Sequence, residues 1–304
     1  MKKTIADGVW PTMITPFTED DRIDFNALAE LIEWYLDHDV TGLFAVCQSS
    51  EMFFLTLDER VKLASAVVEL VDGRAGVIAS GHISGRLTDQ AREIRRIAET
   101  GVEAVVLVTN RLAPEGAPDD VWKQNLERLL EQVPETVPLG FYECPYPYKR
   151  LLSPELMAWC AGTGRFVFLK DTSCDADQIR DKLAVAGDIK LYNANAATLL
   201  TSLQDGAAGY SSVMGNVHPE LYAWLCRNWA EEPTRAERLQ NFLGVASMLG
   251  ARAYPVSAKY YLQLEGLPLS LHTRTRPATD LTSSIKLEVA QLRALTQDYV
   301  AAYL

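Results

Sequence analysis

The sequence predicts an α/β fold, a (β/α)8 TIM barrel with a C-terminal helical extension. Short apolar segments recur along the chain, and amphipathic helical patterns separate them. No G-x-G-x-x-G follows the first segment and no G-x-x-x-x-G-K-[ST] occurs, which disfavours the nucleotide-binding open sheets. A count of eight segments favours the closed barrel. They lie at residues 9–15, 42–47, 76–80, 104–108, 138–142, 166–169, 189–192 and 209–213.

Most of these segments are rich in Val, Ile, Leu or Phe without polar alternation, as expected of strands buried on both faces. The seventh and eighth show this pattern least clearly. Between the segments, apolar residues follow helical spacing, as over residues 25–36. Two capping-box patterns, Thr56 with Glu59 and Thr234 with Glu237, predict helix starts.

The strand pattern ends near residue 225. Helical patterns then follow near residues 235–249, 255–265 and 283–303. We therefore expect a barrel catalytic domain over residues 1–225 and a helical extension over residues 226–304.

The composition excludes several classes of function. The chain has 304 residues, with 29 basic and 40 acidic side chains and a formal net charge of −11. A chain this acidic has no electrostatic reason to bind nucleic acid or an anionic membrane. An anionic substrate would need a local binding feature that overcomes repulsion by the protein's overall negative charge.

Five cysteines without a C-x-x-C pair argue against a disulfide framework and a structural zinc site. No signal peptide and no long apolar stretch are recognisable. These features predict a cytoplasmic location and no membrane association.

One lysine closes a wholly apolar strand. Lys170 follows residues 166–169 and is followed by Asp171. Partial desolvation would lower the pKa of its ammonium, and a neutral amine attacks a ketone to form an imine. The alternative is that Lys170 only ends the strand, reaching solvent or pairing with Asp171.

Two other strand ends carry polar groups that could serve such chemistry. Tyr142 ends the fifth segment and could shuttle protons during imine formation and C–C cleavage. Gln48, Ser49 and Ser50 follow the second segment, where hydroxyls and backbone N–H groups could bind a carboxylate. Taken singly, each is as well explained by an ordinary rim tyrosine or a polar loop.

In combination, these motifs resemble the superfamily of dihydrodipicolinate synthase and N-acetylneuraminate lyase. The resemblance covers nearly the whole chain, including the helical tail. It rests on the Thr-Pro-Phe that ends at Phe17, the loop 47–51, the segment 142–145, the strand 168–171 and the residues 206–216. The resemblance implies a TIM barrel that uses no metal or organic cofactor.

The resemblance also implies roles for individual residues. Lys170 would form the imine and Tyr142 would relay protons. Ser49 and Ser50 would hold the substrate carboxylate, with Gln48 in the same loop. Ser49 would also be catalytic, since it keeps the hydroxyl of that loop in the proton relay. Ser211 falls where the family places a backbone contact near the bound 2-oxo acid. A homotetramer or homodimer is expected on the same basis.

The chain departs from the family pattern in the half of the site that sets specificity. Gln48 replaces a hydroxyl residue, and residues 109–112 lack the tyrosine that dihydrodipicolinate synthases carry after strand four. Their arginine for the second substrate's carboxylate is replaced by Pro147, with Lys149 and Arg150 nearby. The acidic residues with which sialic acid lyases bind sugar hydroxyls are replaced by alanines, Ala196 and Ala197.

Other polar residues have structural interpretations. His82, just past the third segment, is interpreted as a hydrogen-bonded structural histidine. Glu143 is interpreted as a solvated or ion-paired carboxylate. Both remain outside the predicted site.

Two hypotheses of function follow. The first is a lyase of the class I aldolase type acting on pyruvate or another 2-oxo acid, with a 2-keto-3-deoxy sugar acid dehydratase as its variant. The second is a non-catalytic relative that binds a 2-oxo acid, motivated by the altered loop and the missing tyrosine. Retention of Lys170 and Tyr142 together favours the enzyme.

Overall fold

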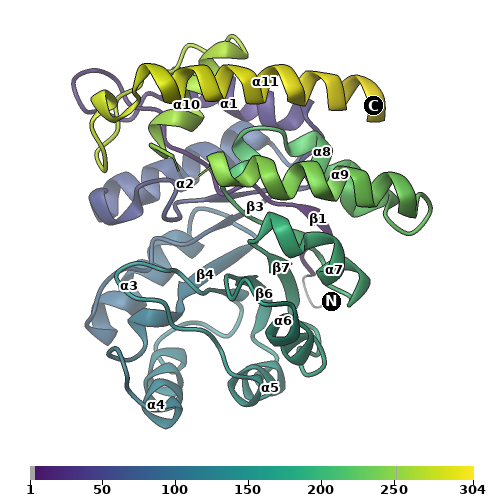
Figure 1. Ribbon diagram of the computed structural model, residues 1–304. Coiled ribbons are helices and arrows are strands. Elements are labelled where there is room, and N and C mark those ends of the chain that lie inside the picture. The colour runs from purple at the N-terminus through teal and green to yellow at the C-terminus, as the bar shows by residue number, and fades with distance from the viewer. Residues whose placement is uncertain (1–3, 251) are drawn as a thin grey trace.

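The computed structural model describes residues 4–250 and 252–304 and has eight parallel strands in one sheet. Their order is β1-β8-β7-β6-β5-β4-β3-β2, and helices alternate with them (Figure 1). The predicted (β/α)8 barrel is confirmed. The strands are β1 (Gly8–Val9), β2 (Gly42–Ala45), β3 (Gly76–Ala79), β4 (Ala104–Val108), β5 (Leu139–Tyr142), β6 (Phe166–Asp171), β7 (Lys190–Asn193) and β8 (Gly209–Tyr210).

The barrel closes between its first two strands in the chain. Thr12 and Phe44 form a parallel bridge just beyond β1. The N–H of Phe44 donates to the carbonyl of Pro11, and the N–H of Met13 donates to the carbonyl of Phe44, both at 3.0 Å. These bonds leave no open sheet edge at this level of the barrel.

All eight expected segments contain a strand, but the first is much shorter than expected. Residues 9–15 were expected to pair throughout, yet the regular ladder of β1 ends at Val9. The N–H groups of Trp10 and Thr12 still donate to the carbonyls of Tyr210 and Ser212 at 2.8 and 3.4 Å, whereas Pro11, which has no N–H, cannot donate on the side that faces β2. The chain instead crosses to β2 through the bridge at Thr12.

Helices surround the barrel, and the C-terminal ones gather on one side of it (Figure 1). Thr56 caps α2 with the predicted capping box. The box predicted at Thr234 is wrong, since α9 begins at Pro233, whose fixed φ suits the first helical turn. The helices are α1 (Phe25–Asp37), α2 (Leu57–Val71), α3 (Leu87–Ala98), α4 (Asp119–Leu130), α5 (Pro154–Thr163), α6 (Ala176–Leu183), α7 (Leu199–Gln204), α8 (Pro219–Asn228), α9 (Pro233–Ala246), α10 (Val256–Leu264) and α11 (Ser283–Tyr303).

Aromatic rings fill the barrel interior. Phe168 stacks on Tyr192 with centroids 4.7 Å apart, and Trp10 meets both rings edge-on at 6.3 and 6.1 Å. Side chains two residues apart on a strand share a face, so Lys170 lies above Phe168 on the inward side of β6. The rings therefore form a floor beneath Lys170.

The C-terminal helices share a core with the last strand of the barrel. Buried residues of α9, α10 and α11 cluster with Val9 and Tyr210 of the barrel and with buried residues of α8. Helix α8 runs through residue 225, the expected end of the barrel domain. The division of the chain at that residue remains a prediction.

Over residues 4–250 and 252–304, the helices are too short or too polar to cross a bilayer. The cytoplasmic location remains a prediction.

Gly42→Ala should destabilise the barrel. A Cβ at Gly42 would lie 2.3 Å from the ring of Trp10, closer than side chains pack. Overpacking of this kind costs about 1–3 kcal/mol of unfolding free energy. Urea unfolding measures the loss. The control is Gly162→Ala in α5, where a Cβ meets nothing within 4 Å. Equal stability of the two variants would contradict the packing of Trp10 against β2.

Candidate active site

The carboxyl-terminal ends of the strands meet at a cavity of about 440 Å³. Reactive groups of (β/α)8 enzymes lie at this end of the barrel. Four of the predicted site residues line the cavity: Gln48, Ser49, Tyr142 and Lys170. The remaining lining residues come from the strand ends and from the extension: Thr12, Glu51, Pro145, Lys149, Thr172, Cys174, Ala194, Ser212, Val213, Tyr254, Pro255 and Thr275.

Lys170 is buried at the end of β6, only 4% exposed. Burial lowers the pKa of its ammonium to about 8. Its Nζ lies 4.7 Å from the ring centroid of Tyr142, its neighbour on β5. None of the ion pairs among residues 4–250 and 252–304 includes Lys170, so the alternative in which it pairs with Asp171 is wrong.

Asp171 faces the other way because neighbouring strand residues alternate sides. Its Oδ2 lies 2.6 Å from Nζ of Lys182, which also contacts Oε1 of Glu143 at 2.6 Å. All three side chains are almost completely buried. The ion-paired interpretation of Glu143 is thereby confirmed. Sequence reasoning missed Lys182, since a lysine in the helical segment 176–183 carries no signal of burial.

The pKa values of Glu143 and Lys182 are both shifted within this trio. Burial, and then Asp171, raise the pKa of Glu143 to about 7. Burial opposes the charge of Lys182, but Glu143 and Asp171 together raise its pKa. Glu143 also accepts the backbone N–H groups of Leu152 at 2.8 Å and Thr172 at 3.0 Å. The trio therefore ties together the ends of β5 and β6, which carry Tyr142 and Lys170.

Tyr142 is held by the loop after β2. Its hydroxyl donates to Oε1 of Gln48 at 3.2 Å, and the Cys144 thiol donates to the same oxygen at 3.3 Å. Phe44 packs edge-on against its ring, with centroids 5.8 Å apart. Burial raises the pKa of Tyr142, so the phenol keeps its proton at neutral pH. A neutral phenol beside an amine of lowered pKa can donate a proton and take it back.

The two serines of the loop have different environments. Ser49 lines the cavity, and its hydroxyl donates to Oγ1 of Thr12 at 3.1 Å. The Ser50 hydroxyl donates to the carbonyl of Met13 at 2.7 Å and accepts the N–H of Cys47 at 3.2 Å. Ser50 thus fixes the loop to the end of β1 and is absent from the cavity wall. Its predicted contact with substrate is not supported by this placement and remains a prediction.

Ser211 is also outside the cavity wall. It is fully buried, and its N–H donates to the carbonyl of Asn193 at 3.0 Å. The next residue, Ser212, lines the cavity instead. The predicted contact of Ser211 was through its backbone, so the facing of its side chain does not decide it. Substrate binding by Ser211 remains a prediction.

Two residues that flank the loop have a strained backbone. Val46 and Glu51, on either side of residues 47–50, have φ of 50° and 61°, and Cys174 has 59°. Side chains rarely adopt this left-handed region, and such strain persists where the surroundings impose it. The conformation of the loop after β2 is therefore imposed by the surrounding structure rather than by the intrinsic backbone preferences of its residues.

The two basic candidates near Pro147 diverge. Lys149 lines the cavity, and its Nζ donates to the carbonyl of Thr172 at 2.8 Å. Arg150 pairs with Asp119 at 2.7 Å and is not part of the cavity wall. Of the two, only Lys149 is placed to meet a ligand.

His82 has the structural role that was expected. Its Nδ1 accepts the N–H of Val108 at 3.0 Å, and its Nε2 lies 2.8 Å from Oε1 of Gln90, an acceptor. Burial lowers its pKa to about 4, which fits a neutral ring with the proton on Nε2. Residues 4–250 and 252–304 hold no cluster of three His, Cys, Asp or Glu side chains suited to a metal ion.

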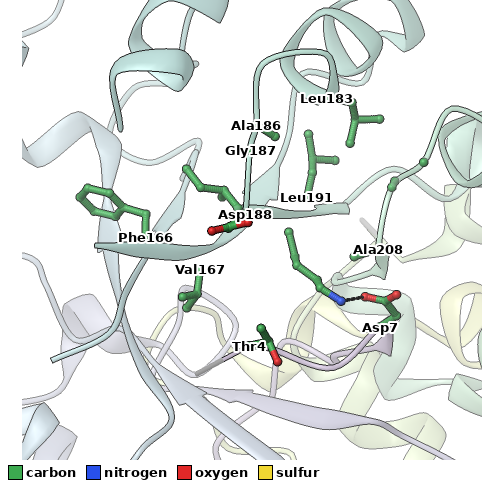
Figure 2. A pocket seen from close by; sticks show the side chains of 14 residues that line it. Thr4, Asp7, Phe166, Val167, Leu183, Ala186, Gly187, Asp188, Leu191 and Ala208 are labelled. Carbon is green, nitrogen blue, oxygen red and sulfur yellow. Dashed lines mark hydrogen bonds and ion pairs between the residues drawn. The ribbon is translucent and has the colours of Figure 1, made fainter. Parts of the chain in front are cut away.

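A second hollow, of about 520 Å³, lies at the opposite end of the barrel (Figure 2). Its lining comes from the starts of β6 and β7, including Phe166 and Val167, and an ion pair between Lys190 and Asp7 crosses it. No predicted site residue reaches it. Since the amino-terminal face of such barrels serves stability, we place the site in the cavity around Lys170.

Fold and cavity define a (β/α)8-barrel protein whose polar groups converge at the carboxyl-terminal mouth on one desolvated lysine. The chain belongs to the dihydrodipicolinate synthetase family, whose model matches residues 6–295.

Two curated relatives are 4-hydroxy-tetrahydrodipicolinate synthases. That of Laribacter hongkongensis is 27% identical over 291 residues, covering 93% of this chain and 97% of the relative. That of Acidithiobacillus ferrooxidans is 30% identical over 224 residues, covering 72% and 74%. The predicted family and the predicted enzyme class, a lyase of the class I aldolase type, are confirmed.

Solved structures show the same fold. A dihydrodipicolinate synthase of Bacillus anthracis matches with a TM-score of 0.86 at 23% identity, covering 96% of this chain and 99% of that one. The E. coli K12 prophage protein YagE, solved in complex with pyruvate, matches with a TM-score of 0.84 at 23% identity, covering 96% and 98%. A monomeric dihydrodipicolinate synthase variant matches with a TM-score of 0.84 at 22% identity, also covering 96% and 98%.

Lys182→Met should destabilise the protein strongly, because it leaves Asp171 and Glu143 buried without their cation. Breaking a buried pair in this way costs about 3–5 kcal/mol. Thermal melting measures the effect. The control is Arg180→Met on the same helix, whose ion pairs are exposed and contribute about 0–1 kcal/mol. Similar melting temperatures for the two variants would refute a structural role for the trio.

Proposed function

We propose that this protein is a Schiff-base-forming lyase or aldolase that acts on pyruvate or another 2-oxo acid through Lys170. The observation that carries the proposal is the placement of Lys170. Its amine is buried, has a pKa near 8, lacks an ion pair among the described residues and faces a cavity beside Tyr142. The other buried lysines differ from it: Lys182 is held by two carboxylates, and Lys259 donates to the carbonyl of His272 outside the cavity wall.

Binding places the carboxylate of the 2-oxo acid at the loop after β2, where the Ser49 and Thr12 hydroxyls lie at the cavity wall. The neutral amine of Lys170 then attacks the C2 carbonyl carbon and forms a carbinolamine. Tyr142 donates its proton to the C2 hydroxyl, which leaves as water. The product is an iminium ion on Nζ and a phenolate on Tyr142.

The iminium acts as an electron sink for the next bond. The electrons of the C3–C4 bond move toward the iminium nitrogen and leave an enamine. The Tyr142 phenolate takes the proton of the C4 hydroxyl, so the departing fragment leaves as an aldehyde. Protonation of the enamine at C3 and hydrolysis of the imine then return Lys170 as a free amine. Synthesis runs through the same steps in reverse.

A 2-keto-3-deoxy sugar acid dehydratase would use the same imine to expel water. We favour C–C chemistry because the curated relatives are synthases. We do not assign the second substrate of those relatives to this protein, because Pro147 stands where the family's arginine is expected. A non-catalytic 2-oxo-acid-binding protein is disfavoured, because binding alone does not require a desolvated amine. A homotetramer or homodimer remains a prediction, and one matching structure is of a monomeric variant.

Borohydride should trap a covalent adduct when the protein is incubated with pyruvate, because hydride reduces the imine to a stable secondary amine. Intact mass measures the adduct. Lys170→Ala should give none, whereas Lys149→Ala, which removes the other lysine of the cavity, should still give it. An adduct on Lys170→Ala, or none on the wild type with pyruvate and a panel of 2-oxo acids, would overturn the proposal.

The rate of trapping should rise with pH and level off above the pKa of Lys170, which is about 8. Only the neutral amine attacks, so below that pH the rate should fall roughly tenfold per pH unit. Quenched-flow mass spectrometry at fixed pyruvate concentration gives the profile. An inflection in the ordinary lysine range, above pH 10, would mean that Lys170 is not desolvated in solution.

A further inference from the structure

The C-terminal extension meets the loop after β2 at the cavity wall. Thr275, between α10 and α11, lines the cavity around Lys170, and so does Glu51 at the end of that loop. The two residues are bonded to each other, because the N–H of Thr275 donates to Oε2 of Glu51 at 2.8 Å. A residue 224 positions further along the chain therefore contacts the loop that carries Ser49.

The carboxyl of Glu51 is bonded by the extension alone. Its Oε2 accepts the N–H groups of Arg274 at 2.7 Å and Thr275 at 2.8 Å, and its Oε1 has no hydrogen bond among residues 4–250 and 252–304. Glu51 is only 2% exposed, so these bonds replace those that water would make. Burial raises the pKa of the carboxyl, yet Oε2 accepts both bonds whether or not Oε1 carries a proton.

Glu51 also closes the turn that presents Ser49. Its N–H donates to the carbonyl of Gln48 at 2.9 Å, and Ser49 lies between the two. The left-handed φ of 61° at Glu51 is a conformation that persists where the surroundings impose it. The two bonds from the extension provide such a constraint. A displacement of Glu51 would therefore move the Ser49 hydroxyl away from Thr12, to which it donates at 3.1 Å.

The side chain of Arg274 fixes the extension at this point. Its guanidinium donates to the Glu59 carboxylate at 2.8 and 3.1 Å and to the carbonyl of Phe54 at 2.9 Å. It also donates to the carbonyl of Asp21 at 2.7 Å and lies over the ring of Phe17, 4.8 Å from its centroid. The segment is thus held against the loops after β1 and β2 together, and its backbone N–H groups are presented to Glu51 from a fixed position.

We propose that Glu51 is a positioning residue for the Ser49 hydroxyl. It ties the loop after β2 to the backbone of Arg274 and Thr275, so that the C-terminal extension sets where this loop lies in the cavity. The inference rests on the proposed function, in which Ser49 receives the carboxylate of a 2-oxo acid. Glu51 acts through the loop and does not touch the reacting atoms.

Glu51→Met removes the acceptor and keeps most of the volume. We expect the pyruvate concentration for half-maximal trapping to rise roughly three- to tenfold, because hydrogen bonds that position Ser49 are lost. The trapped amount at saturating pyruvate should not change. Glu51→Gln keeps an accepting oxygen and should stay within about twofold of the wild type. The matched control is Glu265→Met, which removes a carboxylate of the extension that pairs with Arg293 outside the cavity wall.

Coupling with Ser49 separates positioning from general stability. In a Ser49→Ala background, Glu51→Met should raise the half-saturation little further, since the hydroxyl that it positions is already absent. Independent, multiplied effects would overturn the inference, as would an unchanged half-saturation for Glu51→Met or a rise that Glu265→Met shares. If Glu51→Met does not fold, Arg274→Met, which removes the side-chain anchor of the same contact, must give the rise instead.

Hydrogen exchange distinguishes this inference from the proposed function. Mass spectrometry of the ligand-free protein follows the amides of residues 47–51, which exchange faster when the loop opens locally. Severalfold faster exchange there in Glu51→Met, but not in Glu51→Gln or Glu265→Met, supports the tie to the extension even if the wild type gives no trapped adduct. Unchanged exchange contradicts it even if trapping succeeds.

Discussion

The chemistry proposed for the cavity depends on the separation of the Lys170 amine from the carboxylates of Asp171 and Glu143. Lys170 and Asp171 are adjacent, yet the alternation of β6 sends the amine into the barrel and the carboxylate behind it. Behind the sheet, Lys182 contacts both Asp171 and Glu143. A carboxylate on the inward face would hold Lys170 charged and raise its pKa. The buried trio thus lets an acidic protein maintain a lysine of low pKa, and it also fixes the two strand ends that present Lys170 and Tyr142.

The remaining walls come from parts of the chain far apart in sequence. The loop after β2 brings Gln48 to Tyr142 and Ser49 to Thr12. The extension adds Tyr254, Pro255 and Thr275 to the cavity wall. The strained backbone around this loop and before Tyr254 indicates that tertiary packing, rather than local preference, sets these positions.

The sequence predicted the barrel because buried parallel strands leave a direct signature of unbroken apolar runs. It also predicted Lys170, since a lone charge at the end of such a run is conspicuous. It did not indicate that the side chain of Ser212 lines the cavity, because the facing of residues just past the two-residue β8 depends on register with neighbouring strands. The sequence also did not predict that Tyr254 lines the cavity. Helical periodicity indicates which face of a helix is buried, but it does not indicate which residue of a connecting segment reaches a distant cavity.

The aromatic floor has a consequence for how such a site can change over evolution. Trp10 occupies the space that side chains at Gly42 and Gly76 would need, and Phe168 presses against Gly140 in the same way. The bottom of the cavity therefore cannot be deepened or reshaped without repacking four strands at once. Diversification of substrate is confined to the rim, where loops and the extension vary independently of the barrel. A lineage can then change the rim of the cavity while the residues around Lys170 are inherited unchanged.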